Sequence, residues 1–122
     1  MKNRNTISSK YHTLKINWGL DVSFEQEIDQ TLDLGDTVIV MTNPSKGPGT
    51  IKNLYGVVDD KIVWRVQDTR AFNPAFTPLD HYIGIAIYER DAALFVATND
   101  DGYRILIDPK TGSVVGQAGW VR

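Results

Sequence analysis

The sequence predicts an all-β fold, and three observations support this. Short apolar runs rich in Val, Ile, Tyr and Trp recur along most of the chain, and the clearest alternate with the period of two that a half-buried strand requires. Turn residues separate these runs. The third observation is an internal repeat, in which EIDQTLDLGDTVIVMTN aligns with YIGIAIYERDAALFVATN at an offset of 55 residues.

The chain has the length of one ordinary domain, 122 residues. Residues 1–13 are rich in Asn, Ser, Thr and Lys and have no apolar period, which predicts a flexible tail. We therefore expect a single β domain over residues 14–122. Cysteine is absent, which excludes disulfides and thiolate chemistry and favours a cytoplasmic location.

The first ambiguous element is SFEQEIDQTLDLG, residues 23–35. It fits a helix, because Ser23 and Gln26 form a capping box and Gly35 suits the position after a helix end. It also fits a strand with Ile28, Leu32 and Leu34 on one face. The strand is favoured by the repeat, which aligns this segment with the alternating strand near residue 83, but both readings stay open.

The next elements are less ambiguous. Residues 37–41 are apolar on both faces, which predicts a central strand. In KIVWRVQ the alternation places Ile62, Trp64 and Val66 in the core, and Asp59-Asp60 forms the turn before it.

In the second repeat, Ile83, Ile85 and Ile87 share one face of YIGIAIYE, and one face of this strand is expected to be core. Tyr103, Ile105 and Ile107 likewise share a face. Turns are predicted at residues 100–102 and 108–112, where Pro109 and Gly112 supply the backbone angles of a tight hairpin.

Each repeat therefore contains four short antiparallel strands, as a propeller blade does. Two blades cannot close a propeller, so we expect two four-stranded blade-like units packed as a sandwich or a flattened barrel. A homodimer is one way for such a molecule to cover its exposed strand edges.

The sequence resembles the blade repeat of quinoprotein-like propellers in its aspartate before an apolar strand, its aromatic-led strand ending in IDPKTG and its final Val-Val strand. In the order of these segments it is similar to small uncharacterised bacterial all-β proteins. Some of these are encoded beside secreted toxins and resemble immunity proteins. This resemblance implies binding to a cognate toxin. No cofactor is implied, because quinone sites are assembled by many blades around a channel.

Candidate chemistry is sparse. His12 and His81 are the whole supply of histidine, and the sequence contains no H-x-x-x-H zinc motif and no G-x-S-x-G nucleophile elbow. We therefore expect no metal site and no enzyme activity. The net charge is −2 with scattered basic residues, so no nucleic-acid partner is expected, and no apolar run is long enough to predict a membrane partner.

The segment over residues 67–82, QDTRAFNPAFTPLDHY, is longer than a hairpin connection, and long ordered loops are often functional. Its two prolines restrict the free loop, and its Arg and aromatic residues are typical of binding hot spots. The candidate protein-binding residues are Arg70, Phe72, Asn73, Phe76, Asp80 and His81. The alternative is that the two Phe side chains plug the open end of the sheet.

The sequence thus predicts a noncatalytic protein-binding module, and the resemblance implies an immunity protein that neutralises a toxin by contact. The alternative is a small-ligand-binding β-domain, which needs a concave pocket with convergent polar groups. An enzyme is the third hypothesis, and Asp80 with His81 is its only acid-base candidate.

Overall fold

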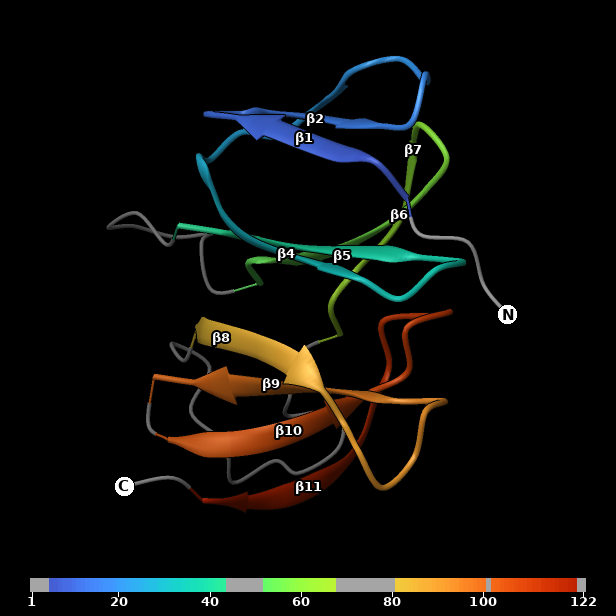
Figure 1. Cartoon of the computed structure of the whole chain (residues 1–122). Coiled ribbons are helices and arrows are strands. Elements are labelled where there is room, and N and C mark those ends of the chain that lie inside the picture. The colour runs from blue at the N-terminus through green and yellow to red at the C-terminus, as the bar shows by residue number, and fades with distance from the viewer. Residues whose placement is uncertain (1–4, 44–51, 68–80, 101, 121–122) are drawn as a thin grey trace.

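A computed structural model of the chain describes residues 5–43, 52–67, 81–100 and 102–120, and every regular element in these ranges is a β-strand (Figure 1). The all-β prediction is therefore confirmed. The strands are β1 (Ile7–Lys10), β2 (Thr13–Ile16), β3 (Val22–Ser23), β4 (Ile28–Asp33), β5 (Val38–Thr42), β6 (Leu54–Val58), β7 (Lys61–Arg65), β8 (Tyr82–Ile87), β9 (Phe95–Asn99), β10 (Tyr103–Ile107) and β11 (Val114–Trp120).

The described strands form three antiparallel sheets. The N-terminal sheet contains β1, β2 and β3, the middle sheet runs β4-β5-β6-β7, and the C-terminal sheet runs β8-β9-β10-β11. In Figure 1 they follow one another from the β1–β2 hairpin at one end of the molecule to β11 at the other. The two four-stranded sheets correspond to the two predicted units, whereas the third sheet was not predicted, and the described strands do not close into a barrel.

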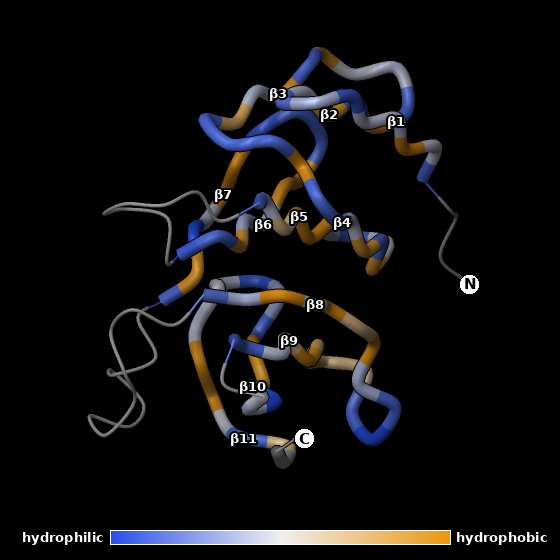
Figure 2. Tube along the Cα trace, turned by 90° about the vertical axis from the view of Figure 1, so that its left-hand side faces the viewer, coloured by the Kyte–Doolittle hydropathy of each residue, from blue (hydrophilic) through white to orange (hydrophobic). Residues whose placement is uncertain are grey.

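The middle sheet has a core on each of its faces. Ile39 and Met41 of β5 belong to the core shared with the C-terminal sheet, while Val38 and Val40 belong to the core shared with the N-terminal sheet. Apolar residues follow β5 and β6 through the centre of the molecule in Figure 2. The prediction that residues 37–41 form a central strand is confirmed, because all of β5 is buried.

Trp64 of β7 joins the middle sheet to the C-terminal sheet. Its side chain is buried, as predicted, and its ring stacks on Phe95 with centroids 6.3 Å apart. Its indole Nε1 donates a hydrogen bond of 2.7 Å to the carbonyl of Pro109. Gly56 and Gly112 flank the ring so closely that an added Cβ would lie 2.2 Å and 2.5 Å from it. Both positions therefore require glycine.

Two side-chain amides also connect these sheets. Asn53, which is 1% exposed, donates to the carbonyls of Thr42 and Tyr82, both at 2.8 Å, and accepts from the Tyr82 amide at 2.9 Å. On β4, Gln30 accepts a 3.2 Å hydrogen bond from the amide of Ile85. The edge of β8 that faces β4 is thus bonded by side chains in place of a neighbouring strand.

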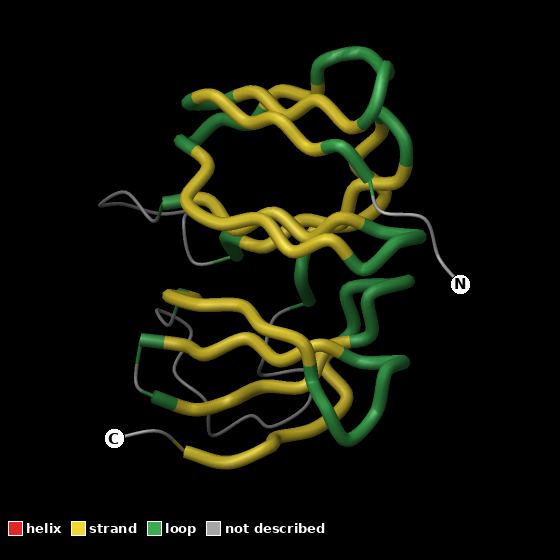
Figure 3. The backbone as a smooth tube through the Cα atoms, in the orientation of Figure 1, coloured by secondary structure: helices red, strands yellow, loops and turns green. Residues whose placement is uncertain are grey.

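Tight hairpins form where the turn residues predicted them (Figure 3). Asp59, in the turn between β6 and β7, and Gly112, in the turn between β10 and β11, have positive φ angles of 56° and 74°. The Gly112 amide donates to the Asp108 carbonyl at 2.8 Å, and the Asp108 carboxylate accepts from the Lys110 amide at 2.9 Å. In the predicted turn at 100–102, Asp101 lies outside the described residues.

The boundary of the predicted tail is wrong. Residues 7–10 form β1, which pairs antiparallel with β2, and Thr13 is the first residue of β2. Asn5 adds hydrogen bonds from its amide and side chain to the carboxylate of Asp33, at 3.0 Å and 2.7 Å. The polar composition of this segment is explained by its exposure, since backbone pairing needs no apolar side chains.

The segment that fitted either a helix or a strand contains β4, so the strand interpretation is confirmed. The predicted common face of its apolar residues is wrong. Ile28 packs against the core of the N-terminal sheet, whereas Leu32 and Leu34 pack against the core of the C-terminal sheet. A register shift between Ile28 and Gln30 explains this, because an extra residue reverses the alternation of faces.

Similar bulges explain why the predicted faces of β7 and β8 are partly wrong. Pairing shifts beside Trp64, which leaves Ile62 exposed while Trp64 is buried. Pairing also shifts after Tyr82, so Tyr82 is buried and Ile83 is exposed. Beyond the shift Ile85 packs against the core, as predicted, and Ile87, which pairs with Phe95 at the end of β8, is exposed. In β10 the predicted face is confirmed: Ile105 and Ile107 are fully buried and Tyr103 packs against them.

Candidate functional site

The predicted binding loop, residues 67–82, is described at Gln67 and at His81 and Tyr82. Arg70, Phe72, Asn73, Phe76 and Asp80 lie outside the described residues, and His81 lies within them. These residues stay a prediction.

His81 lies at the start of β8. Its carbonyl accepts a 2.8 Å hydrogen bond from the amide of Asp100, and its Nε2 lies 3.9 Å from the Asp100 carboxylate. The ring is a quarter exposed. His81 therefore pairs with the residue that follows β9, and this contact fastens the end of the β8–β9 pair.

The described part of the chain has neither a metal-binding cluster nor a membrane-spanning helix. No three His, Asp or Glu side chains there come together as a metal site would require. No helix in the same residues has the length and apolar character needed to cross a membrane.

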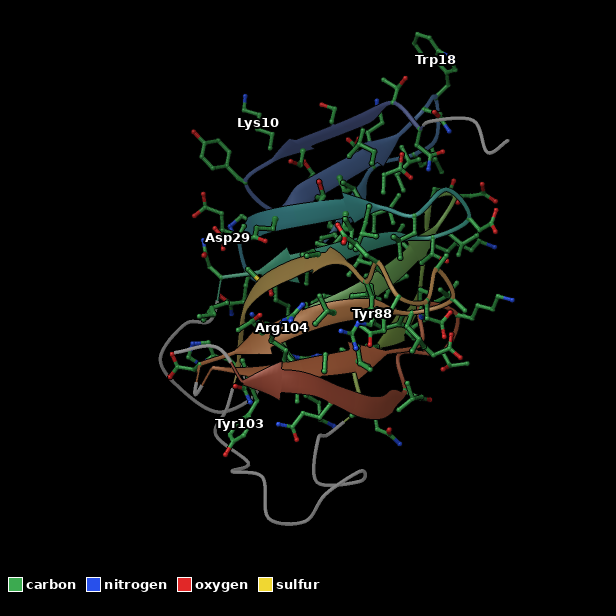
Figure 4. The ribbon with its side chains drawn as sticks, turned by 60° about the horizontal axis from the view of Figure 1, so that its bottom comes forward. Lys10, Trp18, Asp29, Tyr88, Tyr103 and Arg104 are labelled. Carbon is green, nitrogen blue, oxygen red and sulfur yellow. The ribbon has the colours of Figure 1, made fainter. Side chains whose placement is uncertain are left out.

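The β2–β3 loop, residues 17–21, carries the most exposed apolar side chains in the described ranges. Trp18 is 99% exposed and Leu20 is 74% exposed, whereas the next large apolar side chain, Tyr11, reaches 66%. Figure 4 shows the Trp18 ring extending away from the body of the molecule. We call Trp18 and Leu20 the Trp18 tip.

Backbone and side-chain hydrogen bonds fix the conformation of this loop. Asn17 has a positive φ of 54°, a conformation that Asn tolerates better than most residues. Its amide donates to the Thr6 carbonyl at 2.6 Å, and its side-chain oxygen accepts from the Thr6 amide at 2.9 Å. The Gly19 amide donates to the Ile16 carbonyl at 3.0 Å. Trp18 is therefore held between two fixed residues.

The loop is also anchored to the rest of the fold. The Asn17 side chain donates to Asn5 at 3.1 Å, and Asn5 in turn bonds Asp33 at the end of β4. A Cβ at Gly19 would lie 3.6 Å from the Cβ of Asp60, in the β6–β7 turn. The Trp18 tip is thus supported by the middle sheet as well as by its own hairpin.

The charges beside the tip compensate each other. Lys15 and Asp21 form an exposed ion pair with 3.7 Å between their charged atoms, one on each side of the Trp18 tip in the sequence. The apolar tip therefore has a polar rim. A central aromatic residue with a polar rim is the usual arrangement of a binding hot spot.

The Trp18 tip was not predicted from the sequence, because its loop is short and contains no chemical motif. A signal was nevertheless present in the five residues Asn-Trp-Gly-Leu-Asp. Asn, Gly and Asp favour a turn, and turns lie at the surface. Two large apolar residues inside such a turn are therefore expected to be exposed.

Comparison with known proteins identifies a family. Neither the curated proteins nor the solved structures contain a match to the chain. A family model described as a domain of unknown function, DUF7957, matches residues 4–118, which include every strand up to most of β11. The chain belongs to the DUF7957 family.

Proposed function

We propose that this chain is a noncatalytic protein-binding module and that it contacts its partner through the Trp18 tip. The observation that carries the proposal is a Trp side chain, 99% exposed, on a loop fixed by hydrogen bonds. A covered aromatic side chain buries roughly 150–250 Å². At about 25 cal/mol per Å², covering it releases several kcal/mol.

The fixed loop strengthens this interpretation. Binding has to overcome the entropy lost when interface residues become ordered, and a preorganised loop lowers that cost. The backbone on both sides of Trp18 is already hydrogen bonded in the free molecule, at Asn17 and at Gly19. On binding, only the side chains of Trp18 and Leu20 then have to become ordered.

A protein fits this surface better than a nucleic acid does. Aromatic residues that stack on bases normally lie in a positively charged groove. The cation nearest to Trp18 in sequence, Lys15, is paired with Asp21, and the net charge of the chain is −2. The expected partner is a protein with an apolar pocket wide enough for an indole ring.

The toxin suggested by resemblance is the first partner class to test, because an immunity protein acts by contact alone. A second copy of the chain is the other partner to test. We also propose that the protein is cytoplasmic. We infer that the middle and C-terminal sheets are blade-like repeats packed as a sandwich, which is supported by their matching strand order and their shared core.

Site-specific crosslinking in the native host tests the proposal. The photo-crosslinking residue p-benzoylphenylalanine replaces Trp18 in one variant and Ile62 in a control, since Ile62 is an exposed apolar residue on β7. A third variant carries it at Phe72, in the predicted loop. We expect one covalent complex from position 18, reproduced with the purified partner, and none from position 62.

Other outcomes have defined meanings. A complex formed only from position 72 would move the interface to the 67–82 loop and reject the Trp18 tip. Crosslinks between two copies of the chain would identify a homodimer. Equal labelling from positions 18 and 62, or none from any position, would contradict a protein-binding role for this surface.

A further inference from the structure

The outer face of the C-terminal sheet, opposite its core, carries a hollow of about 440 Å³. Its lining residues come from β8, the turn after it, β10 and β11: Ile87, Tyr88, Glu89, Arg90, Arg104 and Ala118. Arg104 faces outward because it alternates with the buried Ile105 on β10. The volume lies within the range of small-molecule sites, roughly 300–1,000 Å³.

Small residues lie beside Arg104 on this face. Across the sheet Arg104 pairs with Thr98, and Thr98 pairs with Gly84, so the three residues form one row. A Cβ added to Gly84 would meet no atom within 4 Å. The row therefore leaves free space at its β8 end.

The charged groups at the hollow favour an anion. Arg104 and Arg90 contribute two guanidinium groups, and Glu89 contributes one carboxylate. Arg104 is half-buried, and within the described ranges its side chain has no hydrogen bond or ion pair. Partly buried guanidinium groups usually pair with carboxylate or phosphate, often through two parallel hydrogen bonds. An oxyanion would supply the missing partner.

Tyr88 adds an aromatic surface to the same site. Figure 4 shows Tyr88 and Arg104 on the face of the C-terminal sheet that is turned forward. Ile87, which is 59% exposed, and Ala118 complete the apolar part of the lining. A ligand with an acidic group and a small apolar or planar part would contact both kinds of residue.

We propose that this hollow binds a small molecule bearing an oxyanion, carboxylate or phosphate, with Arg104 as its main contact and Arg90 as a second. Tyr88 lies against the uncharged part of the ligand. This site is separate from the Trp18 tip, which belongs to the N-terminal sheet.

A titration followed by ¹⁵N–¹H NMR tests the site with two probes, inorganic phosphate and succinate, at constant ionic strength in sodium chloride. We expect saturable shifts at the amides of Tyr88, Arg104 and Ala118. Arg104→Gln should weaken binding by about tenfold or more, because a bidentate charged contact contributes more than 1.4 kcal/mol. Lys61→Gln, which removes an exposed cation on β7, is the matched control and should bind as the wild type does.

The two probes distinguish the sources of the anion. Binding of phosphate alone assigns a phosphate ligand, binding of succinate alone assigns a carboxylate, and binding of both assigns the shared oxyanion. Shifts caused only by a hexaglutamate peptide would overturn the small-molecule site in favour of a protein contact. Equal effects of chloride, or an unchanged affinity in Arg104→Gln, would also overturn it. Trp18→Ser should bind the anions normally, so the two proposals fail independently.

Discussion

Trp64 sets the spacing between the middle and C-terminal sheets, because its ring fills the space between Gly56 on one and Gly112 on the other. Its hydrogen bond to Pro109 prevents the ring from turning away. The sequence predicted that Trp64 is buried, but not that two glycines are needed beside it. Alternation along one strand indicates a face, whereas the room for the ring depends on Gly56 of the neighbouring strand and on Gly112 of the C-terminal sheet, 8 and 48 positions away.

Gly56→Ala and Gly84→Ala form a matched pair that tests this packing. Both glycines lie in strands, but a Cβ at position 56 would lie 2.2 Å from the Trp64 ring, whereas one at position 84 would meet open space. We expect Gly56→Ala to lower the free energy of unfolding by about 1–3 kcal/mol, as overpacking does. Gly84→Ala should leave it unchanged or raise it by about 0.5–1 kcal/mol. Urea midpoints of the two variants measure the difference, and equal midpoints would show that Trp64 does not fill this space.

At the scale of elements, composition predicted β5 and the hairpin turns well. The five consecutive buried positions of β5 favour an apolar run. The tight turn over residues 108–112 favours Asp, Pro and Gly. The bulges in β4, β7 and β8 could not be read from alternation, because one extra residue reverses every later face. The N-terminal sheet was missed because its strands are two to four residues long and mostly polar.

Deleting residues 1–10 tests the place of β1 in the fold. The deletion removes the β1–β2 pairing, the contact of Ile7 with the core and the hydrogen bonds of Asn5 to Asp33 and Gly35. We expect the melting temperature to fall by roughly 5 °C or more, since each kcal/mol corresponds to about 4–8 °C in a small domain.

Two further variants serve as comparisons for the deletion. Asn5→Ala should give a smaller decrease, and Ser9→Ala, at an exposed position of β1, should give none. A deletion variant that melts with the wild type would restore the prediction of a flexible tail.

At the scale of the whole molecule, the two proposed binding surfaces lie on the two outer sheets. The Trp18 tip belongs to the N-terminal sheet and the arginine-lined hollow to the C-terminal sheet, with the middle sheet between them (Figure 1). The middle sheet has a core on each face and connects the other two sheets. Its amides at Gln30 and Asn53 and its ring at Trp64 hold the C-terminal sheet, while Asp33 holds Asn5 of the N-terminal segment.

The candidate site was less predictable than the fold. A side chain is exposed where no other part of the fold packs over it, and a single sequence does not show which faces stay uncovered. Trp18 was detectable only through its turn-forming neighbours, and Arg104 is one of many single basic residues in strands and loops. The candidate binding residues of the 67–82 loop stay a prediction, and of these six His81 lies among the described residues.

The most direct test of the proposed function is the affinity of the purified, crosslink-identified partner for three proteins: wild type, Trp18→Ser and Ile62→Ser. Each variant replaces one exposed apolar side chain, so both should keep the wild-type urea midpoint. Isothermal titration calorimetry should show Trp18→Ser binding about 30-fold or more weakly, the effect of losing a hot spot of at least about 2 kcal/mol. Ile62→Ser should bind within about threefold of wild type, since residues outside a hot spot contribute little. Equal affinities for Trp18→Ser and the wild type would contradict the proposal that this chain binds its partner through the Trp18 tip.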